Sequence, residues 1–180
     1  KQQALLQRIN KELAMTKNAI ELTTNPVVFQ ITNLGPKINT PYDEHSPLVS
    51  ADESVLVFTS NRPGTGITQT ADGKYLEDVY VAEFSGGTWQ KAESLGNIIN
   101  TDGNNATASL SADGNLLVIY QHDGLSGDLY TCEKGPKGWE IPVRMPFPIN
   151  SSYNETHGCF TADGQAFVFT SDRPDGFGGR

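Results

Sequence analysis

Basic residues are scarce in this sequence: 13 lysines and arginines stand against 21 aspartates and glutamates, a formal net charge of -8. A protein that follows the phosphates of a nucleic acid needs a basic stripe that releases counterions on binding. The composition therefore argues against a nucleic-acid partner. The acidic surface by itself indicates only solubility.

Long apolar runs are also missing. No run reaches the roughly 18 apolar residues that a membrane-spanning helix needs, so we expect no direct membrane span. The first residues, KQQALLQRIN, lack the apolar stretch of a signal peptide. We expect either a cytosolic protein or a chain without its native start.

Residues that usually carry chemistry are few. Cys132 and Cys159 match neither a metal-binding spacing nor a disulfide framework, and whether they pair stays open. His45, His122 and His157 occupy three different positions of the repeat described below, so they indicate no shared site. No G-x-S-x-G motif supplies an activated serine. We therefore expect no catalytic residue, no metal and no cofactor.

Glycine and proline are abundant, and the chain contains three copies of one pattern. The copies begin INTPYDEHSPLVSADESVLVFTS at Ile38, INTDGNNATASLSADGNLLVIYQ at Ile99 and INSSYNETHGCFTADGQAFVFTS at Ile149. In each copy a Ser/Thr-Ala-Asp element begins 12 residues after the isoleucine. The second interval is 50 residues, and the first is longer by 11 residues that lie in the loop TGITQTADGKYLE.

Each copy predicts four short strands. In the first they are HSPLVS, SVLVFTS, DVYVAEF and a weaker strand near Trp89, with turns at ADES and SGGT. Four-stranded repeats of about 40 to 50 residues are typical of propeller blades, which cover one another's faces. The sequence thus predicts an all-β fold, a β-propeller with four-stranded blades that start near residues 38, 99 and 149. Since a ring needs at least about four blades, we expect these three to be part of a longer protein.

Two segments precede the repeats. Residues 1–25 have helical spacing of apolar side chains, and residues 26–180 are assigned to the partial propeller. Residues 27–32 hold the place of a fourth strand, so we predict that they close the ring by completing a last blade beyond residue 180. The helix has two open interpretations: a lone packing helix, or the last helix of a tetratricopeptide array.

The repeats resemble a known family. The stretches INTPYDEHSPLVSADESVLVFTSNRPG, DVYVAEFSGGTWQKAESLGNIIN and SDRPDGFGGR are similar to the TolB-like, WD40-like β-propeller repeat. These stretches resemble those of periplasmic proteins of Bacteroidetes that combine tetratricopeptide helices, this propeller and a peptidoglycan-binding OmpA-like domain. The second copy departs from the pattern, because QHDG replaces the Ser-Asn/Asp-Arg-Pro stretch.

One face of such a propeller would collect the long loops. We expect this face to dock another protein, because function concentrates on long loops and because Tyr and Arg are frequent hot-spot residues. The candidate docking residues are Tyr42, Glu44, Arg62, Lys74, Tyr75, Tyr153, Glu155 and Arg173. The alternative is that the repeated Asn, Glu and Arg side chains cap and bridge neighbouring blades.

The function expected from this reasoning is a non-enzymatic interaction scaffold. The resemblance implies a periplasmic, outer-membrane-associated protein whose partners are envelope proteins such as outer-membrane or type IX secretion subunits. A link to peptidoglycan would run through an OmpA-like domain that this sequence lacks. The competing predictions are a substrate-recognition propeller of a hydrolase and a sensor of a small ligand or glycan.

Overall fold

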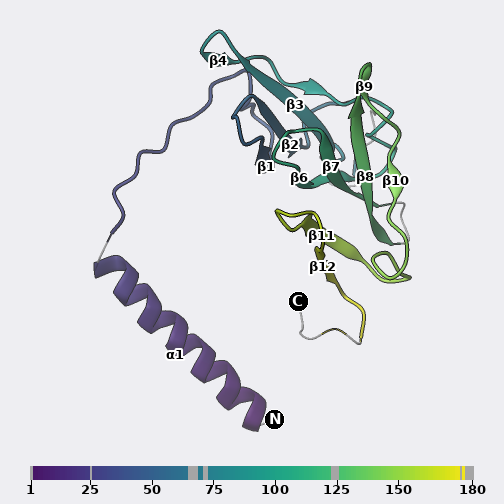
Figure 1. Cartoon of the computed structure of the whole chain (residues 1–180). Helices are drawn as coiled ribbons and strands as arrows, with labels where there is room; N and C mark the ends of the chain where they lie inside the picture. Colours follow the sequence, from purple (N-terminus) through teal and green to yellow (C-terminus); the bar gives the residue numbers. More distant parts are fainter. Residues whose placement is uncertain are drawn as a thin grey trace. The chain divides into compact units, whose positions relative to one another are not determined.

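The computed structural model describes residues 2–24, 26–64, 69–70, 73–122, 126–174 and 176. The chain divides into two compact units, Lys1–Asn33 and Leu34–Arg180, with helix α1 in the first and all strands in the second (Figure 1). The elements are α1 (Gln2–Thr24), β1 (Glu44–Val49), β2 (Val55–Ser60), β3 (Asp78–Ser85), β4 (Thr88–Trp89), β5 (Glu93–Ser94), β6 (Asn105–Leu110), β7 (Leu116–His122), β8 (Gly127–Gly135), β9 (Gly138–Trp139), β10 (Val143–Arg144), β11 (Glu155–Phe160) and β12 (Phe167–Ser171).

The first unit consists of α1 and the extended segment after it. The apolar side chains of α1, such as Leu6 and Leu13, are exposed. Among the residues described, no helix has the length and hydropathy to cross a membrane. Residues 27–32 form no strand, and Val28 is 97% exposed. Their expected partners lie after residue 180, so the ring-closing strand stays a prediction, as does the tetratricopeptide assignment of the helix.

The second unit is built from antiparallel sheets that follow the repeats. The first sheet has the order β1-β2-β3-β4 with β5 also on β3, the second has β10-β8-β7-β6 with β9 on β8, and the third pairs β11 with β12. In all three sheets the pairing of the first two strands contains a bulge. The prediction of a β-rich chain preceded by a helix is confirmed.

The fourth strand of the first and second repeats differs from the prediction. Instead of one strand near Trp89, two short pieces follow the same edge of β3: β4 pairs with Phe84 and Ser85, and β5 pairs with Tyr80 and Val81. Between them the chain leaves regular pairing, and the Ala92 amide donates to the carbonyl of Lys37, 3.0 Å away. The second repeat has the same division into β9 and β10.

The Ser-Ala-Asp element forms a tight turn between the first two strands. The Ser50 hydroxyl donates to Asp52 Oδ1 at 2.6 Å, and the Ser54 amide donates to the same oxygen at 3.0 Å. These bonds, first that from Ser50, lower the pKa of Asp52 to about 2. Ser111 and Asp113 repeat the arrangement, with the Asp113 pKa lowered by the Ser111 hydroxyl. The predicted turn at ADES is present, and its aspartate accepts a hydrogen bond from the backbone two residues on.

The apolar core lies between successive sheets. One cluster, between the first and second sheets, contains Val57, Val79, Ile99, Leu117, Ile119 and Cys132. Another, between the second and third, is built on Val118, Leu129 and Met145. The exposure of the central valine shows how well the second strand of each repeat is covered. Val57 in β2 is 0% exposed and Val118 in β7 is 1% exposed, whereas Val168 in β12 is 62% exposed. Each sheet is therefore buried where another sheet follows it.

A buried asparagine joins each sheet to the one before it. Asn100 Oδ1 accepts a hydrogen bond from the Val79 amide at 2.8 Å, and Asn100 Nδ2 donates to the Val79 carbonyl at 3.1 Å. Asn150 makes the same two bonds to Leu129, at 2.9 and 2.7 Å. We call this paired contact the asparagine latch. Both side chains are nearly inaccessible, so their amides satisfy backbone groups that water cannot reach.

The two cysteines do not pair. Both are free thiols, with Cys132 buried in β8 and Cys159 exposed in β11. Burial raises the pKa of the Cys132 thiol to about 12. Whether Cys132 and Cys159 pair was left open by the sequence, and in this structure they do not.

Removing the latch should cost stability. We expect Asn100→Ala to lower the free energy of unfolding by roughly 1–3 kcal/mol, because it removes the side-chain partner of the buried Val79 amide, while the Val79 carbonyl keeps its hydrogen bond from the Leu95 amide at 3.0 Å. Urea denaturation followed by tryptophan fluorescence measures this. Asn97→Ala, at an exposed position three residues earlier, should change the value by less than about 0.5 kcal/mol. Equal losses in both variants would contradict the role of the latch.

The turn makes a separate prediction. In Ser50→Ala the largest cause of the lowered Asp52 pKa is removed, so the pKa should rise toward the ordinary aspartate value. A pH titration of the aspartate carboxyl ¹³C shifts measures it. Asp113, in a turn of its own, should keep its lowered pKa in the same variant.

Candidate functional site

In the first repeat, a group of polar side chains ties the start of the repeat to the end of β2. Arg62 Nη2 donates to the Ile38 carbonyl at 2.7 Å and to Glu44 Oε1 at 2.8 Å, and Arg62 Nε donates to Ser60 Oγ at 3.0 Å. Thr40 donates to the same carboxylate through its amide and its hydroxyl. We call this group the polar anchor. It fixes the loop before β1 against the loop after β2.

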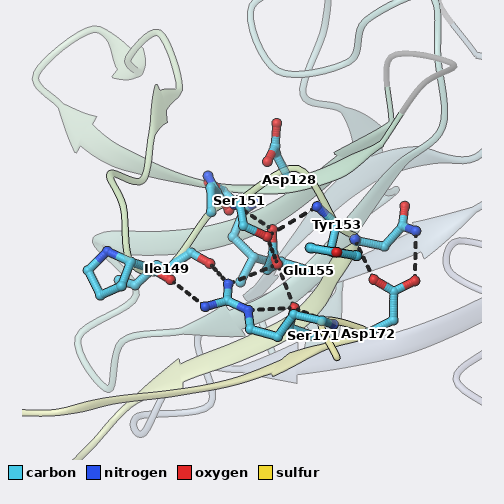
Figure 2. A network of polar contacts seen from close by, with 12 residues as sticks. Asp128, Ile149, Ser151, Tyr153, Glu155, Ser171 and Asp172 are labelled. Atoms are coloured by element: carbon cyan, nitrogen blue, oxygen red, sulfur yellow. Dashed lines mark hydrogen bonds and ion pairs between the residues drawn. The ribbon is translucent and has the colours of Figure 1, made fainter. Parts of the chain in front are cut away.

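The third repeat builds the same anchor around Glu155 (Figure 2). Glu155 Oε1 accepts from the Ser171 hydroxyl at 2.6 Å, from the Ser151 hydroxyl at 2.8 Å and from Arg173 Nη2 at 3.0 Å. Arg173 also donates to the carbonyl of Ile149 at 2.8 Å. The Glu155 side chain is 0% exposed, so its charge depends entirely on these partners.

The second repeat has an uncharged version. Asn105 stands at the position of the glutamate and Gln121 at the position of Ser60. Gln121 Nε2 donates at 2.7 Å to the carbonyl of Ile99, the same repeat position that the arginines bind elsewhere. Asn105 bonds to Thr101 and Gly103 within its own loop. The second repeat therefore lacks both the arginine and the glutamate of the polar anchor.

Aromatic rings and hydrogen bonds complete the electrostatics of the anchor. The Arg62 guanidinium carbon lies 5.1 Å from the ring centre of Phe58 and 4.7 Å from that of Tyr80, in cation–π range. Burial of the Glu155 carboxyl acts to raise its pKa, but the hydrogen bonds from Ser171, Ser151 and Arg173 outweigh burial, and the pKa is lowered. The carboxylate is stabilised in its charged form.

The structure separates the candidate docking residues into two groups. Glu44, Arg62, Glu155 and Arg173 belong to the polar anchors, and their side chains are between 0% and 18% exposed. These contacts lie within one repeat, whereas the alternative that the sequence left open is that such side chains cap and bridge neighbouring blades. The anchors bring each glutamate together with the arginine of its own repeat.

The tyrosines of the candidate set are on the outside. Tyr42 and Tyr153 hold the same repeat position and are 42% and 43% exposed. Their backbone amides donate to Thr40 Oγ1 at 3.2 Å and to Ser151 Oγ at 3.1 Å, the hydroxyls that also bind the anchor carboxylates. The polar anchor therefore holds each loop in the conformation that exposes its tyrosine.

The insertion supplies the remaining candidates. Residues 65–68 and 71–72 lie outside the described residues, but Lys74 is exposed, and the Tyr75 ring packs edge-on against Tyr42 at 6.0 Å. Gln69 and Tyr75 form an antiparallel bridge, and the Thr70 amide donates to the Lys74 carbonyl at 2.8 Å. The structure thus brings Tyr42, Lys74 and Tyr75 into one neighbourhood. We use the name tyrosine surface for these three residues and for Tyr153, which holds the position of Tyr42 in the third repeat.

Gly103 replaces the tyrosine in the second repeat for a steric reason. A Cβ atom at this position would lie only 2.1 Å from the carbonyl oxygen of His122, a distance that no side chain tolerates. The loop of the second repeat therefore lies against the end of β7.

Sequence reasoning missed two contacts. Arg144 donates to both oxygens of Asp128, at 2.9 and 2.7 Å, and Asn154 Oδ1 accepts from the Gly127 amide at 3.0 Å. Asp128 carried a signal, because the two third-strand sequences DVYVAE and DLYTCE both open with aspartate. Arg144 carried none, because the matching residue of the first repeat is Ser94. Within the described ranges, no group of three or more His, Cys, Asp or Glu side chains is arranged to hold a metal ion.

The Glu155 anchor should make stability depend on pH. Because the folded-state pKa is lowered, its contribution is complete above the ordinary glutamate pKa of about 4.3 and is lost as pH falls through the lower folded value. We expect Glu155→Gln to lower the unfolding free energy by roughly 2–4 kcal/mol at neutral pH, a difference that shrinks on acidification. Urea unfolding at a series of pH values measures it. Glu133→Gln, at an exposed position, should parallel the unchanged protein, and a pH-independent loss in Glu155→Gln would contradict the explanation.

Comparisons with known proteins find similarity among solved structures. No family model and no curated protein matches the chain. Among solved structures, the crystal structure of TolB from Acinetobacter baumannii is similar, with 18% sequence identity and a TM-score of 0.47. The match covers 72% of this chain and 27% of that one. The chain thus spans only a minor part of the length of that structure.

Proposed function

We propose that residues 26–180 belong to a β-propeller that serves as a non-enzymatic scaffold for protein–protein interaction. Three repeats, each starting one antiparallel sheet that packs against the next, support the propeller. The observation that carries the scaffold role is the tyrosine surface, because two exposed tyrosines are held at equivalent positions by buried polar anchors. Rigid scaffolds that present tyrosines on loops are suited to docking.

The proposed docking residues act in two ways. Tyr42, Tyr75, Tyr153 and Lys74 would contact the partner, whereas Glu44, Arg62, Glu155 and Arg173 would keep the loops in place. Preorganised loops lower the entropy cost of binding, because few rotamers and backbone angles remain to be fixed. The partner class that we propose is an envelope protein, such as an outer-membrane or secretion-system subunit, with the scaffold in the bacterial periplasm and associated with the outer membrane.

Site-directed crosslinking tests this proposal. In native cells treated with an amine-reactive crosslinker, Lys74 should link to an outer-membrane or secretion-system subunit. Tyr42→Ala combined with Tyr153→Ala should reduce that crosslink at least about tenfold, because a hot-spot side chain contributes roughly 2 kcal/mol. Mass spectrometry identifies the linked peptides. Ile141→Ala, a change at another exposed apolar side chain between β9 and β10, should leave the crosslink unchanged.

Other outcomes would favour the competing functions. Loss of the crosslink in both the tyrosine and the Ile141 variants would remove the tyrosine surface as the docking site. Retention of only soluble peptides, glycans or metabolites, without a protein partner, would favour a hydrolase recognition domain or a ligand sensor. Recovery of the protein from the cytosol after fractionation would contradict the periplasmic location.

A further inference from the structure

A cavity of about 620 Å³ lies beside the loop that precedes β6, and this volume is typical of ligand sites. The loop, the end of β7 and the start of β8 contribute the side chains that decide its chemistry: Thr101, Asp102, Gln121, Asp128 and Tyr130. A comparison with the other repeats shows which kind of group fits this space.

In the first repeat the equivalent space holds Arg62. Ser60 Oγ accepts from Arg62 Nε at 3.0 Å, and the guanidinium carbon lies 4.7 Å from the ring centre of Tyr80. Gly64 also covers this strand, since a Cβ atom on it would lie 2.8 Å from the Tyr80 hydroxyl. Four positions around Arg62 have counterparts in the cavity lining: Thr40, Ser60, Asp78 and Tyr80 correspond to Thr101, Gln121, Asp128 and Tyr130.

The sequence of the second repeat has no arginine for this space. Asp123 stands at the position of Arg62. Strands β7 and β8 pair as far as His122 and Gly127, so residues 123–126 connect them, whereas residues 61–77 connect β2 and β3. Tyr80 is 4% exposed under its cover, but Tyr130 is only partly buried. Part of the Tyr130 ring is therefore accessible.

The charges of the cavity favour a cation. Asp102 is exposed and Asp128 is 8% exposed, and one guanidinium, that of Arg144, donates to both oxygens of Asp128 at 2.9 and 2.7 Å. One cation thus stands against two carboxylates. Gln121 Nε2 already donates to the Ile99 carbonyl at 2.7 Å, so a ligand would use the carboxylates and the ring rather than that carbonyl. A planar guanidinium suits such a site better than an ammonium, because its face stacks on a ring while its edge donates hydrogen bonds.

We propose that this cavity binds the guanidinium group of an arginine side chain from a partner protein. The guanidinium lies over the Tyr130 ring, as that of Arg62 lies over Tyr80, and donates to the Asp102 carboxylate. The source of the arginine follows from the loop 101–104, which is the second repeat's counterpart of the loop that carries Tyr42. In this respect the inference rests on the proposed docking function, but the binding of the side chain can be measured without the partner.

A small probe tests the cavity directly. Acetyl-arginine-amide is titrated into the ¹⁵N-labelled 180-residue chain, and the amide chemical shifts are followed by NMR. Saturable changes should concentrate in residues 101–104, 121–122 and 128–130. Acetyl-citrulline-amide has nearly the same shape but no charge, so it should bind at least about tenfold more weakly. Acetyl-lysine-amide should also bind more weakly than the arginine probe, because an ammonium has no planar face.

Variants of the protein locate the guanidinium. Asp102→Asn should weaken the arginine probe about threefold, as expected for an exposed ion pair, and leave the citrulline probe unchanged. Glu133→Gln removes one negative charge at another exposed position and should leave both affinities unchanged. Tyr130→Phe keeps the ring and should retain binding, whereas Tyr130→Leu should weaken it at least about fivefold. Because Asp102 is exposed, its variant stays informative even where Tyr130→Leu fails to fold.

Four results would overturn the proposal. One is the absence of saturable shifts up to about 20 mM arginine probe, well beyond the range of weak complexes. Another is equal binding of the arginine and citrulline probes. The third is a set of shifts that maps outside the cavity, for example to the polar anchors of the first and third repeats. The fourth is binding of free arginine at least about tenfold tighter than the blocked probe, which would assign the cavity to the amino acid rather than to a protein side chain.

The probe also separates this inference from the proposed docking function. Binding of acetyl-arginine-amide together with loss of the Lys74 crosslink would remove the docking partner and leave the guanidinium site in place. A retained Lys74 crosslink without binding of the probe would remove the guanidinium site alone.

Discussion

The loop geometry of the third repeat depends on a buried carboxylate, that of Glu155 at the start of β11. Glu155 is fully enclosed, and an enclosed charge is tolerated only when hydrogen bonds and a counter-charge replace its water. Ser151, Ser171 and Arg173 supply both: Ser151 comes from the loop before β11, and Ser171 and Arg173 come from the end of β12 and the residues after it. Because one carboxylate needs all of them at once, it fixes the position of the loop before β11 relative to the segment after β12.

The second repeat shows that the geometry matters more than the charge. Asn105 and Gln121 keep the loop closed with neutral amides, and Gln121 reaches the same backbone carbonyl as the arginines. An unpaired arginine or glutamate would be costly in this environment, so the two positions change together. The exposed tyrosine is absent from the same repeat because the backbone at Gly103 lies too close to His122. The second loop is thus closed but presents no aromatic side chain.

Local chemistry explains which features the sequence could predict. The strands, their order and the Ser-Ala-Asp turns depend on short patterns that recur three times, and Ser50 and Asp52 interact within a few residues. The role of Arg62 could not be decided from sequence, because a repeated arginine suits both a docking surface and an internal anchor. The division of the fourth strand and the Asp128–Arg144 pair depend on contacts between segments that carry no repeated signal. Only the three-dimensional structure shows such contacts.

The asparagine latch makes the architecture extendable. The second and third repeats each carry, in their own sequence, the amide that reaches back to the preceding third strand, as Asn100 does to Val79 and Asn150 to Leu129. The contact between two repeats is therefore encoded in the sequence of a single repeat. A tandem duplication of that repeat copies the asparagine latch together with the strands. A chain of this kind can gain repeats by unequal recombination without inventing a new interface, and its cohesion grows with each nearest-neighbour junction.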